Sequence, residues 1–130
     1  MDLKAYFENH TGFGVLSTAD QDGRVNAAVY SRPHFMEDGS LAFIMRGRLT
    51  HQNLQKNPNA VYLFREKNQG YKGYRLYLTK VGEDTNQELI ESISRRSYVQ
   101  DRSELRYLVY FRLDEVLPLV GSGDVASDVD

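Results

Sequence analysis

The residues best suited to chemistry stand together in the stretch 46–54, which reads RGRLTHQNL. Two arginines, Arg46 and Arg48, flank a glycine, and a hydroxyl residue, Thr50, follows near the start of a predicted helix. The amide groups at a helix N-terminus attract negative charge, and a guanidinium can bind phosphate through two parallel hydrogen bonds. The stretch therefore predicts an anion site, with a capped helix and two solvated arginines as the alternative.

Other kinds of catalytic site have little support. The three histidines, His10, His34 and His51, fit neither HExxH nor any paired-histidine spacing, and the chain has no cysteine to assist them. No GxSxG sequence marks a serine nucleophile. The acidic residues fall mainly in predicted turns and helices, where solvated carboxylates are usual. We therefore expect no metal site, and no residue is identified as catalytic.

Positive charge is concentrated in the middle of the chain. The segment 24–80 holds ten basic residues against three acidic ones, a formal charge of +7, although the whole chain has a formal charge of -2. This segment predicts an anionic ligand, with solvated strand charges as the alternative. Nine tyrosines and six phenylalanines could stack on bases. The negative total charge and the absence of a single-strand-binding signature argue against a nucleic-acid partner.

The length of 130 residues predicts one domain, large enough for a hydrophobic core without disulfides. Residues 1–120 would form this domain, and residues 121–130, which begin Gly-Ser-Gly and contain three aspartates, a flexible acidic tail. The first ten residues lack the apolar core of a signal peptide, and no apolar run approaches the ~20 residues that cross a bilayer. We expect a cytoplasmic protein with no membrane partner.

Turn signals divide the chain into short elements. Asp22-Gly23 and Asp38-Gly39 predict hairpin turns, and Asn57-Pro58 predicts the end of a helix. The patterns predict helices over 3–9, 50–56 and 87–96, the last capped by 83–85, and strands over 15–19, 24–35, 41–45, 59–65, 71–81 and 105–113. Six strands with short links favour an antiparallel β-barrel with helices at its ends. Aromatic residues on both faces of the strand 71–81 suggest that a partner subunit covers one face.

Several of these motifs together resemble a known family. The motifs are Asp22-Gly23, Asp38-Gly39, the aromatic Phe43, the basic turn 46–50, and Asn53-Leu54-Gln55-Lys56-Asn57-Pro58 before an apolar strand. In this order and spacing they resemble the pyridoxamine 5'-phosphate oxidase-like family of flavin-binding split barrels. The resemblance is clearest over residues 12–66.

The resemblance implies a mainly β fold, a six-stranded antiparallel split β-barrel with short flanking helices. It also implies a homodimer with FMN at the subunit interface, a small-molecule substrate or electron donor, and an oxidoreductase or flavin reductase that works by flavin hydride transfer. The implied FMN-binding residues lie along the flavin ring (Val29, Tyr30, Ser31), at the ring or ribityl chain (Ile44, Met45) and at the phosphate (Arg46, Arg48, Leu49, Thr50). Arg32 and Lys72 are candidates for positive charge beside the flavin N1 and C2 carbonyl.

Two departures from the family pattern keep alternatives open. Many members have lysine where this chain has Thr50, so Arg46, Arg48 and His51 are the groups that could compensate. The chain ends in GSGDVASDVD rather than in an Arg/His-containing substrate segment, which argues against the vitamin B6 reaction. The alternatives are a non-catalytic module that binds flavin or haem, with His34 or His51 as the iron ligand, and a deazaflavin in the same groove.

Overall fold

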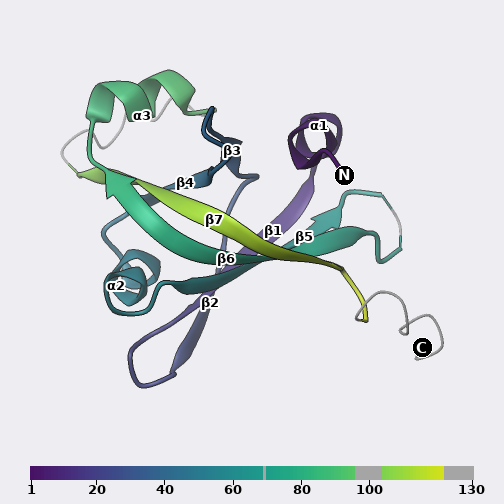
Figure 1. Ribbon diagram of the computed structural model, residues 1–130, viewed down its shortest axis with the longest axis horizontal. Helices are drawn as coiled ribbons and strands as arrows, with labels where there is room; N and C mark the ends of the chain where they lie inside the picture. The colour runs from purple at the N-terminus through teal and green to yellow at the C-terminus, as the bar shows by residue number, and fades with distance from the viewer. Residues whose placement is uncertain (69, 96–103, 122–130) are drawn as a thin grey trace.

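The computed structural model describes residues 1–68, 70–95 and 104–121. Within these residues, seven strands form one antiparallel sheet, in the order β2-β1-β5-β6-β7-β4-β3, and three short helices flank it (Figure 1). The strands are β1 (Gly12–Ala19), β2 (Val25–Val29), β3 (His34–Phe35), β4 (Leu41–Arg46), β5 (Asn59–Glu66), β6 (Gly73–Asp84) and β7 (Arg106–Pro118). The helices are α1 (Leu3–Asn9), α2 (Leu49–Lys56) and α3 (Gln87–Ile93). The predicted mainly β, antiparallel class is confirmed, although the sheet does not close into a complete barrel.

The strand count differs from the prediction at one place. The predicted strand 24–35 is two strands, because β2 and β3 lie at opposite ends of the sheet order. The chain leaves β1 after the Tyr30 amide donates to the Gly14 carbonyl at 3.0 Å, and it joins β4 at His34. Pro33 has no N–H for a ladder hydrogen bond, so it fits the crossing between the two edges.

The ends of the predicted elements shift by a few residues. The Asp-Gly turns are confirmed, since Gly23 and Gly39 have φ of 87° and 91°. The cap of α3 is Asn86 rather than 83–85, because its side chain accepts hydrogen bonds from the amides of Glu88 and Leu89. Helix α3 ends at Ile93, before the predicted end at residue 96, which lies outside the described residues. The predicted acidic tail lies outside them too, except for Gly121.

The inner face of the curved sheet holds the main core. Opposite residues of antiparallel strands point to the same face, and the register aligns Leu16, Tyr62 and Leu76 across β1, β5 and β6. All three side chains are fully buried. Phe7 of α1 packs edge-on against Phe64, with ring centroids 4.9 Å apart, so this helix covers one end of the core. No helix among the described residues is long and apolar enough to cross a membrane.

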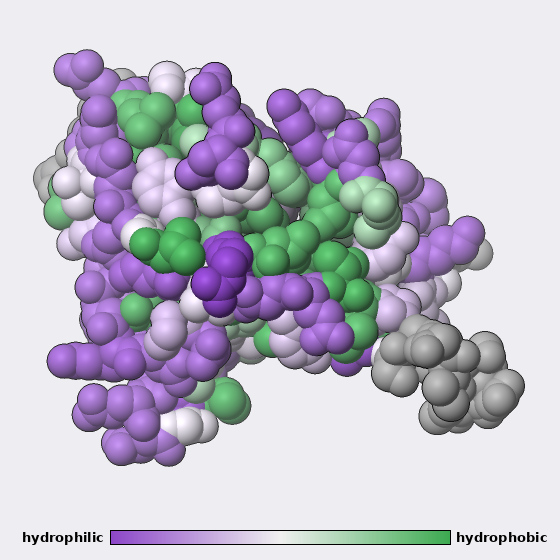
Figure 2. Space-filling view, viewed as in Figure 1, coloured by the Kyte–Doolittle hydropathy of each residue, from purple (hydrophilic) through white to green (hydrophobic). Residues whose placement is uncertain are grey.

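The opposite face of the sheet, here called the outer face, is also largely apolar. The register places one row of side chains across five strands: Val29, Val15, Leu63, Arg75 and Leu117. On the same face, Val25 of β2 and Phe13 of β1 are 78% and 55% exposed. Figure 2 shows hydrophobic residues gathered over the middle of the molecule between hydrophilic rims. Soluble monomers rarely expose a continuous apolar sheet face, so this face is a candidate contact surface.

Candidate functional site

A cavity of about 530 Å³ opens beside β4. Its walls come from the segment that follows β2, from β3 and β4, from the turn before α2, from the end of α3 and from the start of β7. The lining residues are Val29, Tyr30, Ser31, Arg32, His34, Phe43, Ile44, Met45, Arg46, Arg48, Ser94, Arg95 and Arg106. Seven of the nine predicted FMN-binding residues are among them, and only Leu49 and Thr50 are not. The structure therefore brings most of the predicted site together from segments that are distant in the sequence.

Arginines dominate the polar lining of the cavity. Arg46 and Arg106 face each other across the β4–β7 ladder, which places two like charges side by side. Carboxylates outside the lining offset part of this charge: Arg46 Nη1 lies 2.8 Å from Glu104, and Arg106 Nη2 lies 2.7 Å from Glu91. Arg48 also reaches Glu104, at 3.2 Å. One carboxylate thus holds Arg46 and Arg48 together at one end of the cavity.

The turn before α2 has the geometry that the anion-site prediction requires. The Arg48 amide donates to the Arg46 carbonyl at 2.8 Å, which closes a tight three-residue turn around Gly47. Arg48 is the N-cap residue of α2, and its side chain makes no capping hydrogen bond. The first-turn amides of this helix therefore lack the side-chain acceptor that Asp2 and Asn86 provide for the other two helices.

Thr50 and Leu49 lie away from the cavity lining. Thr50 is only 5% exposed, and its hydroxyl lies 3.5 Å from the Asn26 amide nitrogen and also interacts with the Tyr30 phenol. Burial raises the pKa of Tyr30, and the hydrogen bond with Thr50 opposes this effect only in part. Leu49 is 53% exposed. The Thr50 side chain thus supports the cavity wall through Tyr30 rather than opening into the cavity.

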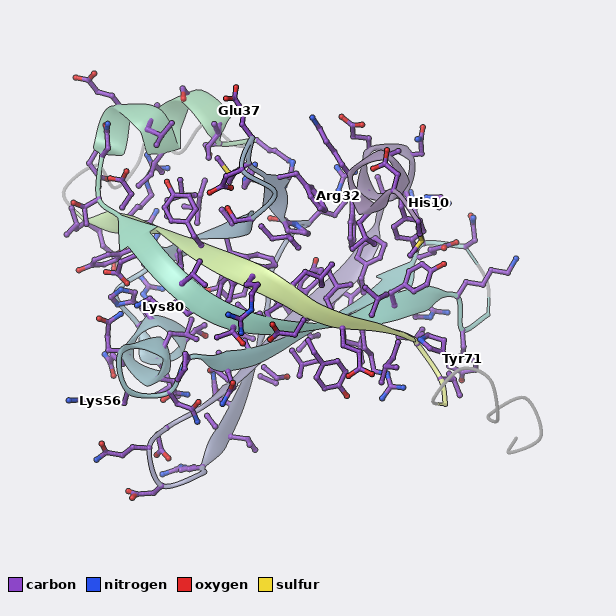
Figure 3. The ribbon with its side chains drawn as sticks, viewed as in Figure 1. His10, Arg32, Glu37, Lys56, Tyr71 and Lys80 are labelled. Carbon is purple, nitrogen blue, oxygen red and sulfur yellow. The ribbon has the colours of Figure 1, made fainter. Side chains whose placement is uncertain are left out.

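Two further arginines line the cavity: Arg32, from the segment that follows β2, and Arg95, from the end of α3. Arg32 Nη1 donates to the Phe7 carbonyl at 2.6 Å and to the His10 carbonyl at 3.1 Å, so its guanidinium lies beside α1 (Figure 3). Arg95 donates to the carbonyls of Arg32 and Pro33, at 2.6 and 3.0 Å. Burial, and then the charge of Arg32, lower the pKa of Arg95. Burial and the charge of Arg95 also lower the pKa of His34 to about 4, so this cavity histidine is neutral at physiological pH.

Two of the other predicted candidates lie outside the cavity. The His51 ring stacks on Tyr107 at 3.8 Å, and its Nε2 lies 3.1 Å from Glu83 and 3.0 Å from Gln55. Lys72 is exposed in the hairpin between β5 and β6. Of the two predicted iron ligands, only His34 therefore lines the cavity.

Sequence reasoning missed Arg95 and Arg106 as site residues. Neither belongs to a recognisable motif, and each reaches the cavity only because α3 and β7 fold against β4 and the segment 30–33. The one available signal was their positive charge. In the described part of the chain, no group of three or more metal-ligating side chains comes together.

The lining combines two chemistries. Val29, Ile44 and Met45 supply an apolar wall, and five arginines supply positive charge, while no carboxylate of the described residues lines the cavity. A cluster of guanidinium groups in a cavity attracts an anion, and the apolar wall favours a flat hydrophobic group. The site is therefore suited to a ligand that has both an anionic group and a flat hydrophobic part.

No protein-family model and no curated protein sequence matches the chain. Solved structures do match. An FMN-binding protein from Syntrophomonas wolfei subsp. wolfei superposes with a TM-score of 0.70 and 19% identity, over 88% of this chain and 82% of that one. An F420 reductase superposes with a TM-score of 0.69 and 12% identity, over 85% and 93%. A candidate pyridoxamine 5'-phosphate oxidase from Listeria innocua has a TM-score of 0.64 and 19% identity, over 90% and 94%.

The chain has the split-barrel fold. The resemblance found in the sequence is confirmed at this level, because the structural neighbours include FMN-binding and pyridoxamine 5'-phosphate oxidase-like proteins. Structural neighbours at such low sequence identity establish only the fold of this chain, because one fold can carry unrelated chemistries. Only the chemistry of the cavity can therefore indicate the function.

Proposed function

We propose that the protein binds FMN in the arginine-lined cavity of a homodimer and acts as an oxidoreductase of the flavin reductase type. The observation that carries this proposal is the meeting of two chemistries in one cavity of about 530 Å³. One end carries Arg46 and Arg48, and the wall beside it carries Ile44 and Met45. FMN has a phosphate and a flat, largely apolar ring, which match these two parts.

The residues present fit the parts of this cofactor. Arg46 and Arg48 would hold the phosphate, with help from the uncapped first turn of α2. Val29, Ile44 and Met45 would contact the ring system. Bound FMN supplies hydride transfer at the flavin N5, and the protein contributes binding, orientation and local charge. A protein nucleophile is not needed for this chemistry.

The proposed homodimer rests on the outer face of the sheet. Val29 belongs to its apolar row, is 67% exposed, and also lines the cavity. A second chain that covered the outer face would therefore lie at the edge of the cavity. Burial of Val15, Leu63 and Leu117 against a partner would remove apolar surface from water, at about 25 cal/mol per Å². The partner could then complete the cofactor site.

A titration with FMN tests the proposal, because flavin fluorescence is quenched when the ring enters a protein site. We expect quenching at micromolar protein, and weaker binding of riboflavin, which lacks the phosphate. FMN that stays unquenched at this concentration would contradict the proposal. If FMN binds, oxidation of NADH or NADPH by the loaded protein tests the enzymatic part. Binding without such turnover supports the non-catalytic module instead.

A deazaflavin is the second candidate for the cofactor. The observation in its favour is the F420 reductase among the structural neighbours. The same cationic end would hold its phosphate, so the cavity alone does not separate the two. Competition between FMN and F420 for the purified protein decides which one binds more tightly.

Haem binding by a non-catalytic module is a third possibility, and it depends on His34. This imidazole lines the cavity and is neutral, the form that ligates iron. If haem binds there, His34→Ala should abolish the Soret band, while His51→Ala should leave it in place.

A further inference from the structure

A second groove, of about 410 Å³, lies between α1, β3 and the end of α3. Figure 2 shows a hollow at the top of the molecule, between the parts that Figure 1 labels α1 and β3. The residues that line the groove are Lys4, Phe7, Glu8, Arg32, Pro33, His34, Phe35, Met36, Ile93 and Arg95. Arg32, His34 and Arg95 also line the first cavity, so the two spaces meet at these three side chains.

The lining of this groove is apolar in its deeper part. Phe7 is 3% exposed, and its ring lies 6.0 Å from that of Phe35. Met36 and Ile93 are half-buried and come from the opposite side, where they pack on a small cluster of buried residues under α3, namely Ala42, Ile90 and Leu108. A groove of this size and composition holds the hydrocarbon part of a small molecule.

The rim of the groove is cationic. Among the residues that the structure describes, Lys4, Arg32 and Arg95 line the rim together with one carboxylate, Glu8. Arg32 and Arg95 are fixed by hydrogen bonds to backbone carbonyls. Among the described residues, neither of these two guanidinium groups forms a salt bridge with a carboxylate.

This pair contrasts with the other arginines of the first cavity. Arg46, Arg48 and Arg106 each have a glutamate partner, at 2.8, 3.2 and 2.7 Å. Arg32 and Arg95 repel each other, and the pKa of Arg95 is lowered by burial and by this repulsion. Two positioned guanidinium groups close enough to repel each other, neither of them paired with a carboxylate of the described residues, can bind an anionic group.

We propose that this groove binds a small apolar carboxylic acid. Its carboxylate lies between Arg32 and Arg95, and its hydrocarbon part lies on Phe7 and Phe35. The neutral His34 beside the pair can donate one hydrogen bond to the carboxylate without adding charge. The acid lies next to the first cavity and within reach of a cofactor held there, but its binding does not depend on the proposed cofactor.

Calorimetric titration of the full chain with 3-phenylpropionate tests the proposal. Its uncharged analogue, 3-phenylpropionamide, is the matched ligand, because it keeps the hydrocarbon part and loses the charge. We expect the amide to bind at least about tenfold more weakly, the usual effect of losing a charge-assisted contact. Equal binding of acid and amide, or no binding of the acid at millimolar concentration, would overturn the proposal.

Substitutions locate the site. Arg95→Gln should weaken binding of the acid about tenfold, and Lys4→Gln should weaken it by a smaller factor, because Lys4 lies at the rim. Arg112→Gln is the matched control: Arg112 pairs with Asp114 on β7 and lines neither space. Thermal melting shows whether Arg95→Gln is folded. If it is not, the test is whether Lys4→Gln and added salt each weaken binding of the acid. Acid binding that none of these changes weakens would overturn the proposal.

Separate FMN titrations distinguish this groove from the cofactor site. Arg32→Gln should weaken binding of the acid more than binding of FMN. If it weakens FMN alone, Arg32 belongs to the cofactor site, as the sequence resemblance implies, and the proposed groove is overturned. If the wild-type chain binds the acid but no FMN, the groove stands and the proposed function fails.

Discussion

The Tyr62 hydroxyl donates a hydrogen bond to the Tyr30 carbonyl at 3.1 Å, and so joins the buried centre of β5 to the wall of the first cavity. Burial raises the pKa of Tyr62, which keeps its hydroxyl protonated and able to donate. The Tyr30 amide in turn donates to Gly14 of β1 at 3.0 Å. Two hydrogen bonds from neighbouring strands therefore fix the point at which the chain leaves the sheet edge and enters the site.

Tyr62→Phe should lower both stability and cofactor binding. It removes the hydroxyl donor of a fully buried side chain, and we expect the free energy of unfolding to fall by about 1 kcal/mol. FMN should bind more weakly as well, because Tyr30 lines the cavity. Urea unfolding and FMN titration measure the two effects. Tyr71→Phe, at a side chain that is 78% exposed, is the control; equal losses in both variants would contradict the expectation.

Substitutions of Arg46, Arg48 and their shared partner Glu104 should change FMN affinity in opposite directions. Arg46→Gln and Arg48→Gln should each weaken FMN binding about tenfold, the usual effect of losing one charge-assisted contact. Glu104→Gln should strengthen it, because the Glu104 carboxylate competes with phosphate for both guanidinium groups. Fluorescence titration with FMN and riboflavin measures these changes.

Riboflavin supplies the control for these three variants, since it lacks the phosphate. Its affinity should change little in all of them, and Arg112→Gln should change neither affinity. If the ratio of FMN to riboflavin affinity stays constant in Arg46→Gln and Arg48→Gln, the phosphate lies elsewhere.

Local chemistry was sufficient to predict much of the fold. The Asp-Gly turns, the helix over 3–9 and the end of α2 before Asn57-Pro58 each depend on residues adjacent in the chain. The break between β2 and β3 was missed because it depends on distant partners. Val25–Val29 pairs with β1, whereas His34–Phe35 pairs with β4, and an apolar pattern does not record which strand lies alongside.

The residues of the candidate site also fall into those that the local sequence predicts and those that only the tertiary packing reveals. Arg46 and Arg48 were predicted because a turn, a glycine and a helix start stand together in the sequence. Arg95 and Arg106 carry no such signal, and only the packing of α3 and β7 brings them to the cavity. Thr50 was expected at the phosphate, but its position on α2 directs the hydroxyl to Tyr30 and Asn26.

The pKa of His34 predicts how stability depends on pH. In the unfolded chain this imidazole takes up a proton near pH 6.5, whereas in the folded protein its pKa is about 4. The contribution of the neutral, partly buried ring is complete above pH 6.5 and is lost as the pH falls from 6.5 toward 4. Unfolding measurements across this window should show a loss of stability that His34→Gln reduces. His10→Gln is the control; a His34→Gln curve with the wild-type slope would contradict the assignment.

The apolar row on the outer face predicts a dimer. The wild-type chain should sediment with a mass near twice the 14.9 kDa of one chain. Val15→Glu places a charge in this row between Val29 and Leu63, where a partner would bury it between two apolar neighbours, so the variant should sediment as a monomer. It should also lose FMN affinity if the partner completes the cavity. Tyr71→Glu, in the hairpin between β5 and β6, is the control that should remain dimeric. A wild-type mass of one chain at micromolar concentration would refute the dimer, and the outer face would then need another partner.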